Sequence, residues 1–242
     1  MSCFYVVPQD VTEDRLILRG EEAHHCLRVR RHQKGDLIEV TDGAGMGYQV
    51  RIERVAAEEL EGRIVAVRPE WGEPKHQITL AQSLIKGDGF DWVVEKTTEL
   101  GVHRIVPMRT ARTVLPTVRP GKISRWNHIA RSAMKQCKRC RQPVVDAVSS
   151  FEETLELLGK LDGMLLAWED ERQHTLRDAM SDLPSVQTLG VLIGPEGGFA
   201  PDELERARQA GARFFSMGPR RLKAETAGIL AVGLILHELE GG

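Results

Sequence analysis

The sequence Ile193-Gly194-Pro195-Glu196-Gly197-Gly198-Phe199 follows a strand-like apolar run and leads into a helix-like segment. A second stretch with the same placement reads Met217-Gly218-Pro219-Arg220-Arg221-Leu222-Lys223-Ala224-Glu225-Thr226-Ala227. Such turns bring bare backbone to the carboxyl end of a parallel sheet, where α/β proteins bind ligands. Neither stretch matches a phosphate-binding loop or a dinucleotide fingerprint. The two turns therefore predict a ligand pocket of another kind, with tight strand-to-helix connections as the structural alternative.

Strand-like and helix-like segments alternate upstream of and around these turns. We expect strands at residues 78–83, 104–108, 164–167, 190–193 and 213–217. We expect helices near residues 90–100, 122–139, 151–158, 201–209 and 225–239. This alternation predicts an α/β domain with a parallel sheet covered by helices.

The first part of the chain has a different pattern. Short segments with β-branched or alternating apolar residues occur at 4–7, 15–18, 37–41, 48–55 and 62–67, with one helix-like segment at 21–32. Five short strands at this spacing predict a small, closed or partly closed β-barrel. Two prolines and a glycine within residues 69–74 indicate a linker. We therefore predict two domains, 1–72 and 73–242.

Composition is that of an ordinary globular protein. The 242 residues are 41% hydrophobic and 28% charged, with a net charge of −2. No apolar run approaches the roughly 18–20 residues of a membrane helix. The first residues lack the features of a secretory signal, and four unevenly spaced cysteines do not form a disulfide framework. We expect a cytoplasmic protein.

The small net charge conceals an uneven distribution. Residues 109–141 contain ten Lys or Arg and no acid, whereas residues 146–182 contain ten acids and three bases. A concentrated basic segment predicts a polyanionic partner such as a nucleic acid. The alternative is a solvated helix face whose charges meet acidic neighbours in the fold.

Motifs along the whole chain carry a family resemblance. Besides the two turns, they include His25 with Leu27 and residues 28–31, Leu80-Ala81-Gln82-Ser83, Lys86-Gly87-Asp88, Glu95-Lys96, Thr98-Glu99-Leu100-Gly101, and Gln136 with Arg139. Together they resemble the RsmE family of 16S (small-subunit) ribosomal RNA (uracil-N3)-methyltransferases, of the SPOUT superfamily. Met217, Arg221, Lys223 and Ala224 depart from the pattern of that family.

The resemblance implies a trefoil-knotted, parallel-sheet methyltransferase domain preceded by a PUA-like β-barrel that binds RNA. It implies methyl transfer from S-adenosylmethionine to N3 of a uridine in the decoding region of 16S rRNA. By carry-over, the pocket walls are residues 166–169, residues 193–197, and residues 217–222 with Thr226 and Ala227. The cofactor-binding residues among them are Leu166, Ala167, Glu169, Ile193, Gly194, Gly197, Met217, Gly218, Leu222, Thr226 and Ala227. A homodimer is also implied, with Ile229, Leu230, Leu234 and Ile235 in its interface or, alternatively, in the core.

The implied chemistry needs no metal, because the sulfonium methyl is already activated. The N3–H proton must leave, which calls for a base or for groups that stabilise the resulting anion. Glu225 is the candidate base, and Arg220 or Arg221 the candidate cation. The alternative role for Glu225 is to cap the last helix.

Ten basic residues are candidates for RNA phosphate contacts, which set register and confer salt dependence. They are Arg28, Arg30, Arg31, Lys86, Arg109, Arg112, Arg125, Lys135, Arg139 and Arg141.

Cys137 and Cys140 form a single C-x-x-C pair. One pair is weak evidence for a structural zinc site, which needs four ligands. We expect both cysteines to lie passively on a helix, with thiol pKa values lowered by the neighbouring bases.

Two other functions remain open. One is a SPOUT methyltransferase acting on ribose 2′-O or on another base. The other is a non-catalytic RNA-binding ribosome assembly factor that has kept the fold.

Overall fold

The computed structural model describes residues 3–56, 58–114, 121–181, 183 and 186–241. The chain divides into two compact units, residues 1–73 with 131–142 and residues 74–130 with 143–242. The predicted domains 1–72 and 73–242 differ from these units in Glu73 and in segment 131–142. That segment folds with the first unit because ion pairs join Lys135 to Glu22 and Arg139 to Glu73.

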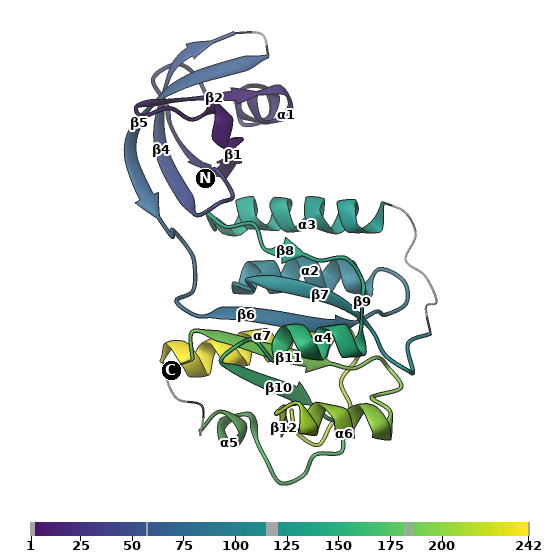
Figure 1. The fold of residues 1–242 in the computed structure, drawn as a ribbon. Coiled ribbons are helices and arrows are strands. Elements are labelled where there is room, and N and C mark those ends of the chain that lie inside the picture. The colour runs from purple at the N-terminus through teal and green to yellow at the C-terminus, as the bar shows by residue number, and fades with distance from the viewer. Residues whose placement is uncertain (1–2, 57, 115–120, 182, 184–185, 242) are drawn as a thin grey trace. The chain divides into compact units, whose positions relative to one another are not determined.

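The first unit is a curled five-stranded sheet in the order β1-β3-β4-β5-β2 (Figure 1). Its strands are β1 (Cys3–Tyr5), β2 (Arg15–Arg19), β3 (Leu37–Thr41), β4 (Met46–Val55) and β5 (Glu59–Pro69). All neighbours are antiparallel except β1 and β3. Register shifts in the β4–β5 pair bend these long strands, which lets the sheet wrap around one apolar core.

One short 3-10 turn (Pro8–Asp10) and two short helical segments complete this unit. Helix α1 (Gly20–His24) continues into a π-helical turn (His25–Val29), where a single helix over 21–32 was predicted. Alternate residues of β2, Leu16 and Leu18, are buried, as the period-2 pattern predicts.

The second unit contains a parallel sheet in the order β12-β10-β11-β6-β7-β8, with β9 pairing with β7. Its strands are β6 (Gln77–Ser83), β7 (Arg104–Arg109), β8 (Val144–Val145), β9 (Ser149–Ser150), β10 (Gly163–Ala167), β11 (Thr188–Ile193) and β12 (Arg213–Phe215). The central strands β6 and β11 are buried along almost their whole length, as expected for a sheet covered on both faces. The prediction of a parallel α/β domain is confirmed.

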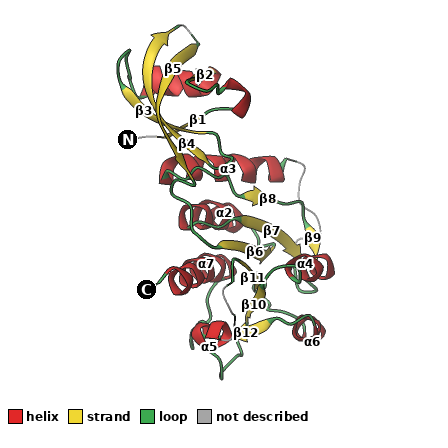
Figure 2. Cartoon of the chain, turned by 60° about the vertical axis from the view of Figure 1, so that its left-hand side comes forward, coloured by secondary structure: helices red, strands yellow, loops and turns green. Residues whose placement is uncertain are grey.

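Helices cover both faces of this sheet (Figure 2). They are α2 (Gly89–Leu100), α3 (Lys122–Cys137), α4 (Phe151–Leu158), α5 (Leu176–Ser181), α6 (Pro201–Gln209) and α7 (Ala224–Glu240). One apolar core includes residues of α2, α3 and α7, and a second includes residues of α4 and α6. Within the described ranges, every helix is too short or too polar to span a lipid bilayer.

The last helix returns from the edge of the sheet to its centre. Strand β12 is the edge strand, yet α7 packs against β6 and β11 and beside α2. The loops after β10 and β12 are joined where Trp168 N–H donates to Phe215 O at 3.1 Å and Ser216 N–H donates to His174 O at 2.9 Å. This return brings the loops after β10, β11 and β12 together.

Candidate functional site

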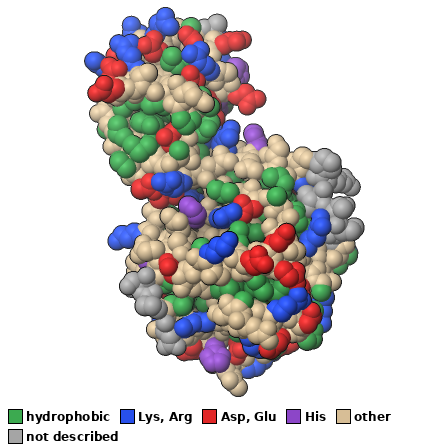
Figure 3. All heavy atoms as spheres, viewed as in Figure 1, with side chains coloured by type: hydrophobic (Ala, Val, Ile, Leu, Met, Phe, Trp, Pro, Cys, Tyr) green, Lys and Arg blue, Asp and Glu red, His purple; other side chains and the backbone are tan. Residues whose placement is uncertain are grey.

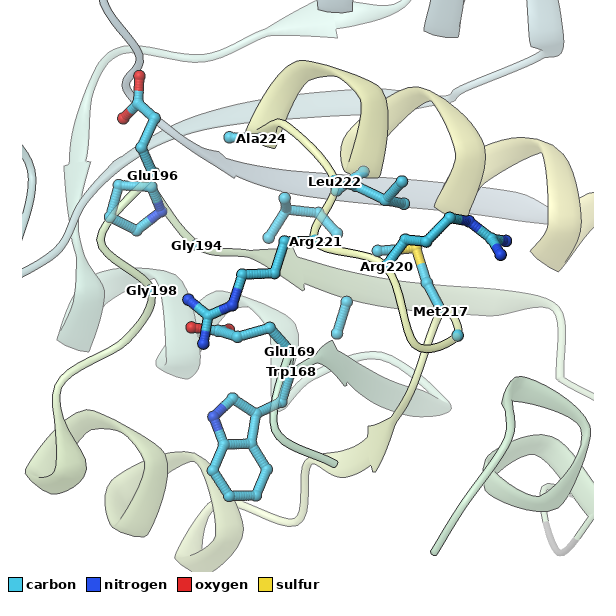
Figure 4. A pocket seen from close by; sticks show the side chains of 15 residues that line it. Trp168, Glu169, Gly194, Glu196, Gly198, Met217, Arg220, Arg221, Leu222 and Ala224 are labelled. Atoms are coloured by element: carbon cyan, nitrogen blue, oxygen red, sulfur yellow. The ribbon is translucent and has the colours of Figure 1, made fainter. Parts of the chain in front are cut away.

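A cavity lies where these three loops meet (Figure 4). Its empty space, which includes the solvent at its open mouth, is about 660 Å³. The residues that line it are Ala167, Trp168, Glu169, Ile193, Gly194, Pro195, Glu196, Gly198, Met217, Gly218, Arg220, Arg221, Leu222, Ala224 and Ala227. Both glycine-rich turns therefore contribute to one pocket.

Two glycines in the wall have backbone conformations that other residues rarely adopt. Gly198 has φ +67° and Gly218 has φ +100°. A Cβ on Gly198 would lie 2.2 Å from Oε1 of Glu169. The absence of a side chain at Gly198 therefore lets the Glu169 carboxylate lie against the glycine-rich loop (Figure 4).

The loop after β10 is shaped by one buried carboxylate. Oε1 of Glu171 accepts hydrogen bonds from the N–H groups of Arg172, Gln173 and His174 at 2.9, 2.7 and 3.2 Å. Burial alone would raise the pKa of Glu171, but these backbone donors outweigh it and lower the pKa. The ionised carboxylate holds the segment that follows Trp168 and Glu169 in the cavity wall.

Most of the predicted cofactor-binding residues come together in this wall. They are Ala167, Glu169, Ile193, Gly194, Met217, Gly218, Leu222 and Ala227. Leu166 is instead fully buried in the core beneath it, and Gly197 is exposed, with its carbonyl accepting a hydrogen bond from Arg112 at 2.8 Å. Thr226 lines a second cavity.

Two residues of the wall, Gly198 and Ala224, lie outside the predicted wall segments. Both belong to the glycine-rich turns, so counting the whole of each turn as wall would have included them. Trp168, Pro195 and Glu196 also line the cavity and fall within the predicted segments, although they were not named as cofactor-binding.

The candidate catalytic residues divide between two cavities. Arg220 and Arg221 line the first, and Nη2 of Arg221 lies 3.7 Å from Oδ1 of Asp170. Glu225 lines the second cavity, with Asp88, Gly89, Trp92, Lys223, Thr226, Ile229 and Leu230. Because Ala224 and Ala227 face the first cavity, the first turn of α7 separates the two. The arginines can stabilise an anion that develops at the glycine-rich loops.

The predicted RNA-binding residues also divide into two groups. Arg28, Arg30, Arg31, Lys86, Arg109 and Arg112 are exposed, and none has an acidic partner among the residues that the structure describes. Arg125, Lys135, Arg139 and Arg141 form ion pairs. On the visible faces in Figure 3, basic and acidic side chains are interspersed rather than gathered by sign.

Arg139 corrects the prediction of a phosphate contact at that position. Its side chain is 4% exposed and donates two hydrogen bonds to Oε2 of Glu73, at 3.1 and 2.6 Å. Oε1 of Glu73 accepts from the N–H groups of Cys140 and Arg141. Arg139 and Glu73 are thus a buried, fully engaged pair that a phosphate cannot reach.

The prediction of lowered thiol pKa values is wrong. Burial raises the pKa of Cys140 to about 11 and also raises that of Cys137. The neighbouring bases do not reverse this, because desolvation of the thiolate outweighs their charge. In the described part of the chain, no group of three or more His, Cys, Asp or Glu side chains could hold a metal ion.

Two protein-family models match this chain. The model of the RNA methyltransferase domain family matches residues 72–236, and that of the RNA methyltransferase PUA domain matches residues 18–65. The ribosomal RNA small subunit methyltransferase E of Bacillus subtilis is 30% identical over 230 residues, which cover 92% of this chain and 90% of that protein.

Solved structures show the same fold over nearly the whole chain. A probable rRNA-methyltransferase from Porphyromonas gingivalis is 33% identical with a TM-score of 0.84, covering 99% of this chain and 98% of that one. The ribosomal RNA small subunit methyltransferase E from Neisseria gonorrhoeae, solved with S-adenosyl methionine bound, is 27% identical with a TM-score of 0.84, covering 97% and 96%. The chain therefore belongs to the RNA methyltransferase family that includes the ribosomal RNA small subunit methyltransferases E.

Proposed function

We propose that this chain transfers a methyl group from S-adenosylmethionine to N3 of a uridine in small-subunit ribosomal RNA. The observation that carries the proposal is the cavity in which both glycine-rich turns and two arginines meet. The names of the related proteins support small-subunit rRNA as the substrate, and the motif resemblance supports N3 of uridine in the decoding region.

The residues of the first cavity fit this cofactor. Ile193, Met217 and Leu222 supply apolar surface for a flat base, and the glycines leave backbone groups open to its polar edge. The carboxylates of Glu169 and Glu196 can accept hydrogen bonds from hydroxyl or ammonium groups. When bound, the cofactor supplies a methyl group activated by its positive sulfur.

The chain itself must remove the N3–H proton or stabilise the anion that remains. Arg220 and Arg221 line the cofactor cavity, which supports a role in holding the negative charge on the uracil. Glu225 is the proposed base. Because it lines the second cavity, this role needs the uracil to approach beside the first turn of α7. An unchanged single-turnover rate in Glu225→Gln would assign Glu225 to helix capping alone.

We propose the first unit as the RNA-binding module, through Arg28, Arg30 and Arg31 on and after its π-helical turn. All three are exposed, and the matched family model is named for RNA methyltransferases. Reversing Arg28 and Arg30 to Glu should weaken RNA binding and leave the affinity for S-adenosylmethionine unchanged. Equal loss of both would contradict this division of labour.

We also propose that two copies pair through the surface formed by α2 and α7. Trp92, Leu100, Leu230 and Leu234 are exposed there, at 61%, 41%, 37% and 37%. Ile235 is fully buried in the core and takes no part, and Ile229 is half-buried. Sedimentation should show a dimer that Leu230→Glu with Leu234→Glu converts to a monomer.

The deciding experiment is methyl transfer from labelled cofactor to assembled small subunits and to naked rRNA, followed by nucleoside identification. N3-methyluridine supports the proposal. A ribose 2′-O-methyl group or another methylated base would show that the enzyme methylates a different position of the RNA. RNA binding without transfer, and without cofactor binding in calorimetry, would indicate an assembly factor.

A further inference from the structure

Three basic side chains lie at or just after the carboxyl ends of the neighbouring strands β6 and β7. Lys86 follows β6, Arg109 is the last residue of β7, and Arg112 lies on the loop after it. We name Lys86, Arg109 and Arg112 the cationic edge. Ser83 at the end of β6 pairs with Met108 in β7, and Gln82 pairs with Ile193 of β11. Neighbouring strands lie about 4.8 Å apart, so the loops of the cationic edge begin beside the glycine-rich loop that follows β11.

The side chains of the cationic edge are exposed and form no ion pair with the described acids. All three side chains belong to exposed residues, and none pairs with an acid in the ranges that the structure covers. Such cations remain available to a polyanion without first breaking an internal ion pair.

The loop after β7 is fastened to the glycine-rich loop and to α6. Oε1 of Glu203 accepts a hydrogen bond from Ala111 N–H at 2.7 Å, and Nη1 of Arg112 donates to Gly197 O at 2.8 Å. Glu203 is 2% exposed. These bonds hold the loop in place before any ligand arrives, which lowers the ordering cost of binding.

Hydroxyl groups fasten the same loop to β6. Oγ1 of Thr113 accepts from Thr110 N–H at 2.9 Å and is hydrogen-bonded to Oγ of Ser83 at 3.1 Å. The loop that begins after Arg109 and carries Arg112 is thus joined to the last residue of β6 as well as to the glycine-rich loop after β11.

Most of the other described bases of the basic segment form ion pairs with acids from distant parts of the chain. Lys122 and Arg125 both contact Asp91, at 3.6 and 2.7 Å, and Arg131 lies over the ring of Tyr5. Ion pairs further join Lys135 to Glu22, Lys138 to Glu39 at 2.8 Å, Arg139 to Glu73 at 2.6 Å and Arg141 to Glu70 at 2.5 Å. The charges of the six ion-paired bases are thus already matched within the fold.

We propose that the cationic edge binds backbone phosphates of the ribosomal RNA next to the cofactor cavity, and that the ion-paired bases from Lys122 to Arg141 do not contact the RNA. The proposal rests on the proposed function in taking RNA as the substrate. The phosphate-binding surface is then the carboxyl edge of the sheet, and not the whole basic segment of residues 109–141. Phosphate contacts there set the register of the RNA against the site of methyl transfer.

The test compares two double variants of equal charge change in RNA-binding titrations over a range of salt concentrations. In Lys86→Gln with Arg109→Gln, the slope of log K against log[salt] should become shallower by about one for each lost contact, about two in all. In the matched control, Lys122→Gln with Lys138→Gln, the slope should match that of the unchanged protein. Lys86→Arg should keep the full slope, because a phosphate contact needs the charge.

Cofactor titration separates this outcome from a folding defect. The affinity for S-adenosylmethionine in the absence of RNA should be the same in both double variants, since none of the four residues lines the cofactor cavity. An equal slope change in the two variants, or an unchanged slope in Lys86→Gln with Arg109→Gln, would overturn the proposal. Failure of the proposed function is distinguishable, because the salt slope is measured by binding and needs no methyl transfer.

Discussion

Oε1 of Gln82 lies directly against the backbone of Gly228, where a Cβ would be only 2.1 Å away. Gln82 is fully buried on β6, and Oε1 has no hydrogen-bond partner among the described atoms. An unsatisfied buried acceptor costs about 1–3 kcal/mol, and glycine inside a helix costs about 1 kcal/mol relative to alanine. The fold accepts both costs where α7 packs against β6, one residue after the cavity-lining Ala227.

Gly228→Ala should destabilise the protein although alanine favours helix. The added methyl collides with Gln82, and overpacking of about 1–3 kcal/mol outweighs the gain of about 1 kcal/mol in helix propensity. Urea denaturation should show a lower free energy of unfolding, and Gln82→Ala in the same chain should recover part of the loss.

Gly233→Ala is the matched control on the same helix. Its Cβ would meet only Leu100, at 3.6 Å, an ordinary contact. This variant should be as stable as the unchanged protein or more so. Equal effects at Gly228 and Gly233 would show that the close approach to Gln82 does not limit position 228.

Gly198→Ala should weaken binding of S-adenosylmethionine at least tenfold, equivalent to about 1.4 kcal/mol. The new Cβ meets Glu169 at 2.2 Å and strains a backbone with φ +67°. Gly211→Ala provides the control, because φ there is +87° but no atom lies within 4 Å of the added Cβ. Calorimetry should show lost affinity for the first variant only, and an equal loss in both would point to general strain.

Glu203→Gln should loosen the connection between α6 and the loop after β7. The two carboxylate oxygens accept from Ala111 N–H and Ala200 N–H, and an amide can replace only one of these acceptors. One buried donor is left unpaired, at about 1–3 kcal/mol.

For this variant we expect a higher KM for RNA with a smaller change in kcat, measured by steady-state methyl transfer. Glu205→Gln, an exposed change on the same helix, should alter neither. A selective fall in kcat would assign Glu203 to the chemical step.

Stability should fall as the pH rises above about 9. Burial raises the pKa of Cys140 from 9.0 to about 11, so between these values the folded chain keeps a proton that the unfolded chain loses. The unfolded state binds fewer protons there, and the free energy of unfolding decreases with pH. Cys140→Ala should flatten this slope in urea denaturation between pH 8 and 11, and an unchanged slope would show that Cys140 does not contribute.

The predicted strands and helices agree with the structure where a segment has a strong period of its own. The helix at 151–158 and the strand at 37–41 have the predicted bounds, because capping residues, turn dipeptides and apolar alternation act locally. Helix α5 was not predicted, and neither were β8 and β9. The two strands have two residues each, too few to show a period, and they form only because β7 offers an edge.

Charge and burial were predicted less well. The basic segment indicated a single phosphate-binding surface, yet Lys135 and Arg139 meet acids that are 113 and 66 residues away in sequence. The thiol pKa of Cys140 follows burial rather than its basic neighbours. In both cases the deciding neighbours come from other elements of the fold.

The sequence by itself determined the kind of protein this is. Glycine and proline impose their backbone conformations locally, so the turns at 193–199 and 217–227 identified a pocket at the carboxyl ends of parallel strands. Only the tertiary structure decided which bases stay free of ion pairs, and that Glu225 and Ala224 face different cavities. The physical reason is that turn geometry depends on residues adjacent in the sequence. Ion pairing, burial and the cavity that each residue of α7 faces depend instead on which distant segments pack beside it.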